Sequence, residues 1–289
     1  MPAIETRAVS KAFERNKPVL KRVSLSIEEG EMVALIGASG SGKSTLLRLL
    51  CGLETVDRGT GGTIALFGSD VQVDGRRTAQ ARRIRRDVGV VFQQFNLVNR
   101  LSVLKNVLAG RLGKTASWRG TLGLFAHGDK LRALKALERV GIVSFAHRRA
   151  SRLSGGQQQR AAIARTLTQE ARLILADEPI ASLDPASAES VMETLSRINR
   201  EDGVTVVVSL HQIDHAFRHC KRIVALKNGE LVFDGPAADV DRAALAALYD
   251  SDVLSDRDMP APAEPPVPGH GDAPLAVVSR ETAPEAMRA

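Results

Sequence analysis

The chain has 289 residues, of which 44 % are hydrophobic and 25 % charged, and this is the composition of an ordinary globular protein. Its apolar runs are far shorter than the ~20 residues that cross a bilayer, and its N-terminus lacks a secretory signal, so we expect a cytoplasmic location. The net charge is +7, and the acidic segment 251–289 leaves +11 on residues 1–250. This charge fits a nucleic acid, an acidic lipid surface or a nucleotide as partner, and it does not choose between them.

Strand-like and helix-like segments alternate through the first 250 residues, which predicts an α/β domain with a largely parallel central sheet. Apolar residues spaced by three or four positions predict one helix that ends at Gly141 and another that begins at Pro185. Continuous apolar runs of the kind buried on both faces of a sheet predict strands at 32–36, 88–92, 173–176, 204–210 and 222–226.

The motif G-x-x-x-x-G-K-S occupies residues 37–44, between the first of these strands and a helical stretch. Its glycines allow backbone N–H groups to converge on phosphate oxygens without a Cβ in the way. Lys43 is suited to the β- and γ-phosphates, and the hydroxyl of Ser44 is suited to Mg²⁺. The motif predicts a P-loop nucleotide-binding protein. The nucleotide-binding residues expected here are Gly37, Ala38, Ser39, Gly40, Ser41, Gly42, Lys43, Ser44 and Thr45.

A basic cluster of six arginines precedes the strand at 88–92. They fit contact with a nucleic acid or an acidic membrane surface, or, as we prefer, the solvated face of a helix beside anionic headgroups. The cluster consists of Arg76, Arg77, Arg82, Arg83, Arg85 and Arg86.

A second loop of small residues, Ser154, Gly155 and Gly156, stands at the start of a helical stretch. It resembles a second anion-binding nest, so the chain has two phosphate-binding loops. If the two loops cannot reach one nucleotide within a subunit, a head-to-tail two-fold dimer would close two composite sites.

The strand at 173–176 ends in two carboxylates, Asp177 and Glu178. Ligands of open α/β sheets collect at the carboxyl ends of strands, so Asp177 is predicted to hold Mg²⁺ and Glu178 to act on the attacking water as a general base. His211 follows the strand at 204–210 and suits a hydrogen bond to the γ-phosphate.

His215 and His219 have the spacing of a metal pair, but without a third ligand we expect them to be surface residues.

The stretch 153–157, Leu-Ser-Gly-Gly-Gln, resembles the signature of the ABC ATPase family, and the likeness extends over residues 3–250. It implies a P-loop core with a largely parallel sheet, an antiparallel β subdomain and a helical signature subdomain. It also implies a homodimer that uses ATP and Mg²⁺. Residues that resemble the family's functional positions are Phe13 (adenine stacking), Gln93 (catalysis and Mg²⁺), Ser154, Gly155, Gly156 and Gln157 (signature), Asp184 (D-loop) and His211 (switch histidine).

Two classes of function remain, a transport ATPase and a soluble ABC protein that acts on nucleic acid. The chain has neither a long coiled-coil insertion nor a second cassette, so we prefer transport and expect no nucleic-acid partner. A cassette without a fused membrane domain fits an importer. Segments 108–113, 117–125 and 176–185 resemble phosphonate import ATP-binding subunits, which implies permease subunits, a periplasmic phosphonate-binding protein and a peripheral place on the inner membrane's cytoplasmic face. A phosphate ester or an amino acid stays open as the solute.

Three expectations concern segments outside these motifs. Seven of the twelve prolines lie between Pro260 and Pro284, so we expect an ATPase domain at 3–250 and a disordered tail at 251–289. Trp118 is expected either to anchor a permease contact or to fill the core of the helical subdomain. Cys51 and Cys220 are expected to be buried free thiols.

Overall fold

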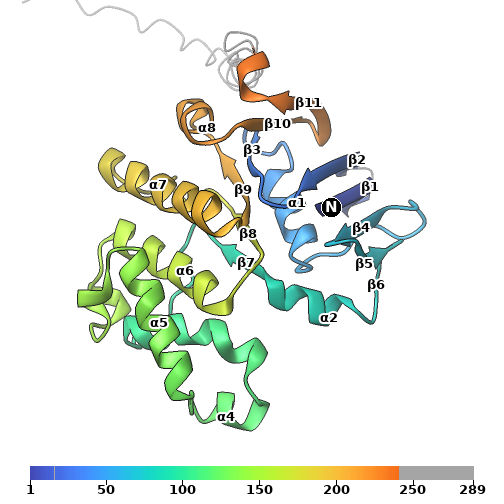
Figure 1. Cartoon of the computed structure of the whole chain (residues 1–289). Coiled ribbons are helices and arrows are strands. Elements are labelled where there is room, and N and C mark those ends of the chain that lie inside the picture. The colour runs from blue at the N-terminus through green and yellow to red at the C-terminus, as the bar shows by residue number, and fades with distance from the viewer. Residues whose placement is uncertain (16, 241–289) are drawn as a thin grey trace, which may run out of the picture.

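The computed structural model describes residues 1–15 and 17–240, which form two sheets and a helical region (Figure 1). The expected tail at 251–289 lies outside the described residues. Within the described part, no helix combines the length and the apolar character needed to cross a membrane.

The central sheet has six strands in the order β11-β10-β3-β9-β8-β7. Neighbouring strands are parallel except that β11 runs antiparallel to β10. Every residue of β3, β8 and β9 is buried, as the apolar runs predicted. The parallel strands therefore present their carboxyl ends at one edge. Their bounds are β3 (Met32–Ile36), β7 (Val88–Val91), β8 (Leu173–Ala176), β9 (Thr205–Leu210), β10 (Arg222–Lys227) and β11 (Glu230–Pro236).

The second sheet is antiparallel, with its strands in the order β2-β1-β4-β5-β6. Helix α1 (Lys43–Leu50) lies between the two sheets, where its leucines share one hydrophobic core with Ile4 and Ile64 of the antiparallel sheet and with Val33 and Leu35 of β3. The predicted antiparallel subdomain is therefore present and covers one face of the central sheet. Its strands are β1 (Pro2–Glu14), β2 (Lys17–Glu28), β4 (Thr63–Leu66), β5 (Ser69–Val73) and β6 (Arg76–Arg77).

Helices cover the opposite face of the central sheet, where Ala34 and Ile36 of β3 join a second core. Their boundaries follow local signals: Pro185 is the first residue of α7, as predicted, and Gly141 takes φ +72° just after α5. The predicted helical subdomain is the segment between β7 and β8. The helices that contribute to this core are α3 (Val103–Leu108), α5 (His127–Arg139), α6 (Gly155–Gln169), α7 (Pro185–Asp202) and α8 (Ile213–His219). Helix α4 (Ser117–Thr121) lies between α3 and α5 in the chain, and α2 (Ala81–Ile84) packs its Ala81 into the first core, beside the antiparallel sheet.

The arginine cluster is solvated, but it does not form one helical face, so that part of the prediction is wrong. Its first two members pair with β5 as strand β6, and the others lie in α2 and the following 3₁₀ turn. Arg82, Arg85 and Arg86 line a cavity of about 320 Å³ together with Lys114 and Arg165. This places the cluster beside the helical segment that follows α3.

Candidate functional site

The loop between β3 and α1 has a backbone that only glycine accommodates. Gly42 caps α1 with φ +104°, and a Cβ there would lie 2.6 Å from a methyl carbon of Leu20. A Cβ on Gly37 would lie 2.3 Å from the carbonyl oxygen of Leu226. The loop is therefore wrapped too tightly for any side chain at these two positions, as a phosphate cradle requires.

Lys43 lies inside this loop and is almost fully buried. Its Nζ donates to the carbonyl oxygens of Gly37 at 2.6 Å and Ala38 at 3.0 Å. Burial lowers the pKa of Lys43, against the opposing effect of the Glu178 and Asp177 charges, which raise it. The ammonium group is thus held by two exchangeable backbone contacts, from which it can turn toward a phosphate oxygen.

A cavity of about 160 Å³ is formed by residues 39–45 of this loop together with Val19 and Glu178. Larger cavities exist elsewhere in the described chain, one of about 540 Å³, but they contain none of the motif residues, so size alone would not locate the site. Ser41 fits a nucleotide phosphate here because its Oγ is buried and has no hydrogen-bond partner. Thr45 lines the same cavity.

Asp177 follows β8 and is hydrogen-bonded by two serines. Ser44 Oγ donates to Asp177 Oδ1 at 2.8 Å, and Ser209 Oγ donates to the same oxygen at 3.0 Å. The hydroxyl and the carboxylate predicted to serve Mg²⁺ therefore already touch. Their oxygen chemistry fits this ion, which prefers carboxylate and hydroxyl oxygens. Ser209, near the end of β9, was not among the predicted site residues.

Glu178 has an unusual backbone conformation, with φ +47° in the left-handed region. Its N–H donates to Ser209 Oγ at 2.8 Å, and its Oε1 lies 2.5 Å from Nε2 of His211. His211 comes directly after β9, which runs between β3 and β8 in the sheet. The structure therefore brings together two of the three predicted catalytic residues, Glu178 and His211, and the contact between them was not foreseen.

The signature residues form the capped start of α6. Ser154 is the N-cap: its Oγ accepts from the N–H of Gln157, whose side chain accepts in return from the N–H of Ser154. Asp184 caps α7 with a single hydrogen bond, its Oδ1 accepting from the N–H of Ser187 at 3.0 Å. A Cβ on Gly156 would lie 2.8 Å from the Cβ and Oγ of Ser187, so the two capped helix starts lie side by side.

Gly155 belongs to the same contact, since a Cβ there would lie 3.0 Å from a Leu183 methyl carbon. Helix α6 packs on α3, α5 and α7, whereas α1 packs on β2. The signature and the phosphate cradle thus belong to different layers of the fold.

Two predicted residues stand apart from these contacts. Phe13 is 56 % exposed on β1, with the Lys11 ammonium 5.2 Å from the centroid of its ring. Gln93 is exposed just beyond the end of β7, one strand past β8 at the carboxyl edge of the sheet.

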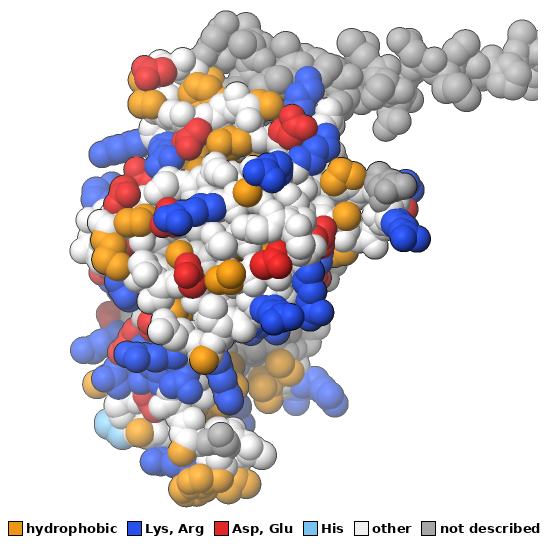
Figure 2. All heavy atoms as spheres, turned by 90° about the vertical axis from the view of Figure 1, so that its right-hand side faces the viewer, with side chains coloured by type: hydrophobic (Ala, Val, Ile, Leu, Met, Phe, Trp, Pro, Cys, Tyr) orange, Lys and Arg blue, Asp and Glu red, His pale blue; other side chains and the backbone are white. Residues whose placement is uncertain are grey.

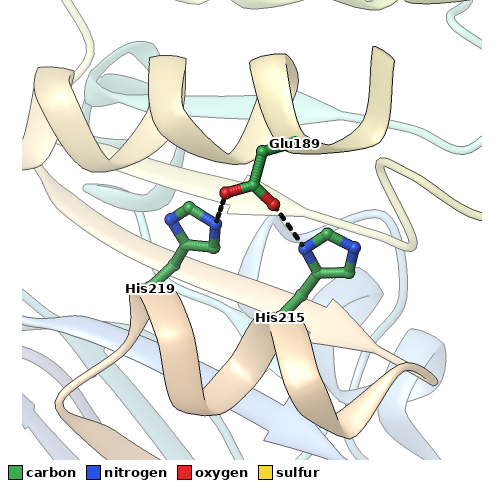
Figure 3. A group of neighbouring side chains, drawn as sticks. All are labelled: Glu189, His215 and His219. Atoms are coloured by element: carbon green, nitrogen blue, oxygen red, sulfur yellow. Dashed lines mark hydrogen bonds and ion pairs between the residues drawn. The ribbon is translucent and has the colours of Figure 1, made fainter. Parts of the chain in front are cut away.

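The prediction for His215 and His219 is wrong. A third potential ligand exists, because the carboxylate of Glu189 on α7 reaches both imidazoles, and the His215 and His219 side chains are only 14 % and 8 % exposed (Figure 3). The sequence signal was limited to the helical spacing of the two histidines, since nothing in the sequence places Glu189 opposite them.

A family model described as "ABC transporter" matches residues 20–181. The chain belongs to the ABC transporter family. It is 60 % identical over 250 residues, 86 % of this chain and 90 % of the relative, to a protein of Pseudomonas syringae pv. syringae (strain B728a) named phosphonates import ATP-binding protein PhnC 2. It is 58 % identical over 251 residues to PhnC of Stutzerimonas stutzeri, covering 87 % of this chain and 91 % of that relative.

A solved structure supports the same family membership. It is a dimeric post-hydrolysis state of the ATP-binding cassette MJ0796 bound to ADP and Pi, with a TM-score of 0.69 and 37 % identity over 81 % of this chain and 98 % of that one. The fold and the family inferred from the motifs are thereby confirmed.

Proposed function

We propose that this chain is the ATP-binding and ATP-hydrolysing subunit of an ABC importer that takes up phosphonates. The observation that carries the proposal is identity of 60 % over nearly the whole length of a protein named for phosphonate import. The cradle at 37–45 and the hydrogen-bonded cluster of Ser44, Asp177, Glu178 and His211 support the ATPase part. The alternatives are an importer of another small solute and, less favoured, a soluble ABC protein acting on nucleic acid.

Some residues of the site bind the phosphate groups and the metal ion, and others act on the attacking water. When bound, ATP supplies the γ-phosphoryl group, and Mg²⁺ neutralises charge on its oxygens. Lys43 exchanges its backbone carbonyl contacts for phosphate oxygens, while Ser44 and Asp177 would hold the metal ion, with Gln93 as a further oxygen ligand. Glu178 accepts a proton from water at its carboxylate, and His211 holds that carboxylate in place through Nε2.

Substitutions separate these roles. Lys43→Ala should lose both ATP affinity and turnover. Glu178→Gln should keep ATP bound, accumulate a dimer on size-exclusion chromatography and lower turnover by ~10²-fold or more, as expected for loss of a positioned acid–base group. Equal turnover in Glu178→Gln and wild type would remove Glu178 from the mechanism.

The proposed assembly is a head-to-tail homodimer in which each nucleotide lies between the cradle of one copy and Ser154, Gly155, Gly156 and Gln157 of the other. Asp184 lies beside that signature, and Phe13 is free to stack on adenine. The position of the two loops in separate layers supports this arrangement, as does the dimeric state of the 37 % identical cassette.

Complementation of inactive variants tests the shared site. Lys43→Ala and Ser154→Arg each disable both sites of their own homodimer. In a mixture, a heterodimer regains one intact site, so activity should return to about a quarter of wild type, because half of randomly formed dimers are mixed. Sites formed within one subunit would give no recovery.

Helix α4 and its surroundings form an exposed apolar tip, the α4 tip, which consists of Trp118, Leu122 and Leu124. Figure 2 shows hydrophobic side chains gathered at the lower end of the molecule, where Figure 1 places α4. Trp118 is 64 % exposed, so the alternative that it fills the core of the helical subdomain is wrong. Aromatic side chains of this kind dominate protein interfaces, which supports a permease contact within segment 93–125.

The permease contact predicts a specific defect. Trp118→Ala should keep the melting temperature and ATPase of the isolated subunit and abolish co-purification with the permease. Val232→Ala, at a 46 % exposed residue of β11, is the matched control and should assemble normally. Normal assembly of Trp118→Ala would place the contact elsewhere.

The substrate is tested in the complete transporter. Reconstituted with permease subunits and a periplasmic binding protein, the ATPase should be stimulated by micromolar phosphonates and not by amino acids or sugars. Stimulation by an amino acid would retain the ABC mechanism and overturn the phosphonate assignment. In this assembly the chain is peripheral, on the cytoplasmic face of the membrane.

A further inference from the structure

Helices α7 and α8 present three potential metal ligands to one another. Glu189 lies in the second turn of α7, and His215 and His219 lie one turn apart on the facing side of α8. In Figure 3 both imidazole rings point across the helix contact at the Glu189 carboxylate. His215 Nδ1 lies 3.5 Å from Oε2 of Glu189, and His219 Nε2 lies 3.1 Å from Oε1.

We propose that Glu189, His215 and His219 form a binding site for a divalent transition-metal ion of the zinc class. The three ligand atoms all lie within 4.8 Å of one another. Bonds of about 2.0–2.1 Å in a tetrahedral zinc site place neighbouring ligand atoms about 3.3 Å apart. Each imidazole nitrogen lies at about this distance from one of the two Glu189 oxygens, His215 from Oε2 and His219 from Oε1. Rotation of the carboxylate and the rings within the 4.8 Å spread would bring one oxygen and both nitrogens around an ion, with one open position.

The state of the histidines favours an ion over a simple hydrogen-bonded cluster. His215 Nδ1 is buried and has no hydrogen-bond partner, although a carboxylate lies just beyond hydrogen-bond range. An unpaired buried nitrogen is costly unless something fills the space, and a metal ion does so.

The surrounding charges are compatible with an ion. Arg218 donates to Oε2 of Glu189 at 2.8 Å, but its side chain is 61 % exposed and free to move toward solvent. A carboxylate has about four lone-pair sites, so Glu189 can also serve both groups. Two imidazoles and one carboxylate suit zinc, cobalt or nickel, whereas Mg²⁺ prefers oxygen ligands such as Ser44 and Asp177.

The position of the site links it to the rest of the fold. Helix α7 begins at the residue after Asp184, and α8 begins two residues after His211. An ion held by Glu189 and the two histidines would therefore join the helices that follow the D-loop and the switch histidine. A ligand that binds only the folded state raises the melting temperature, so zinc should stabilise the protein.

The experiment uses full-length protein without a histidine tag and without nucleotide. Zn²⁺ affinity is measured by chelator competition, and Co²⁺ is used as a spectroscopic probe of tetrahedral coordination. We expect one equivalent per chain. His215→Ala and His219→Ala should each weaken Zn²⁺ binding at least about tenfold, since loss of even an outer-sphere partner costs 10- to 100-fold. His147→Ala, at an exposed histidine, and His211→Ala should leave this affinity unchanged.

A further pair of variants separates metal binding from packing and remains informative if an alanine variant fails to fold. Glu189→Gln should weaken Zn²⁺ binding, whereas Glu189→His should retain it, although both remove the carboxylate that pairs with Arg218. Zinc should raise the melting temperature of wild type and Glu189→His but not of Glu189→Gln. The proposal would be overturned if wild type bound zinc no more tightly than His219→Ala and Glu189→Gln.

Discussion

Gly156→Ala tests the contact between the signature and the D-loop within one subunit. Gly156 is the second residue of α6, and Gly128 is the second residue of α5. A Cβ at Gly156 would lie 2.8 Å from both the Cβ and the Oγ of Ser187, whereas a Cβ at Gly128 meets only the mobile end of Arg132 at 3.5 Å. The same substitution at the same helix position is therefore crowded at Gly156 and unhindered at Gly128.

The magnitude follows from two opposing effects. Replacing a helical glycine by alanine contributes about 0.5–1 kcal/mol of stability at either position. Overpacking against Ser187 costs about 1–3 kcal/mol, because a Cβ on a neighbouring helix backbone cannot rotate away. The net cost of Gly156→Ala is therefore about 0–2.5 kcal/mol. With about 2–4 °C per kcal/mol for a domain of this size, Gly156→Ala should lower the melting temperature by up to about 10 °C, and Gly128→Ala should raise it by about 1–4 °C.

Thermal melts of the two variants and of wild type measure this difference, and ATPase assays report whether the displaced α6 start also lowers turnover. Ser187→Gly removes the obstructing atoms, so in that background Gly156→Ala should no longer destabilise the protein. If the melting temperature of Gly156→Ala is as high as that of Gly128→Ala, then the α6–α7 contact accommodates the added methyl group at no cost in stability. That result would refute the argument that the signature and the D-loop are rigidly paired.

Three further predictions concern stability and thiol chemistry. Truncation after Asp250 should change the melting temperature by less than about 2 °C, because the Pro-rich composition of 251–289 offers little apolar surface to bury. Arg111→Met should cost about 3 kcal/mol in urea unfolding, since it removes the 2.9 Å partner of the nearly buried Asp129 carboxylate and leaves it only the exposed Arg132 at 3.6 Å. By contrast Arg132→Met, at a 51 % exposed arginine, should cost less than about 1 kcal/mol. Burial raises the pKa of the Cys220 thiol to about 12 and also shifts the pKa of Cys51 upward, so neither thiol should react with a disulfide reagent at pH 8 until the chain unfolds.

The sequence predicted those parts of the site whose functional residues all lie within one short segment at a characteristic spacing. The cradle at 37–44 and the capped start at Ser154 are examples, because a turn between a strand and a helix is determined by neighbouring residues. The strands at 32–36 and 173–176 have the predicted bounds, since residues buried on both faces leave a continuous apolar run. The basic cluster was misread because six arginines carry no apolar period that distinguishes a strand from a helix.

Contacts between distant segments could not be predicted in this way. The approach of His211 to Glu178 depends on β9 running beside β8, and strand order is not encoded in the periodicity of either strand. Glu189 meets His215 only because α7 and α8 pack against one another with the required rotation. In both cases the residue types were visible in the sequence and their partners were not.

Ser209 shows how the same sheet order supports the reacting residues. A non-glycine residue with φ near +47° costs on the order of 1–3 kcal/mol and persists only where its surroundings hold it. At Glu178 the holding group is the Ser209 hydroxyl, which accepts from the Glu178 N–H and donates to the Asp177 carboxylate. One buried side chain at the end of β9 thus orients both acids that follow β8. His211, two residues after Ser209 and just beyond the end of β9, then reaches the carboxylate that this backbone turn directs toward the cradle.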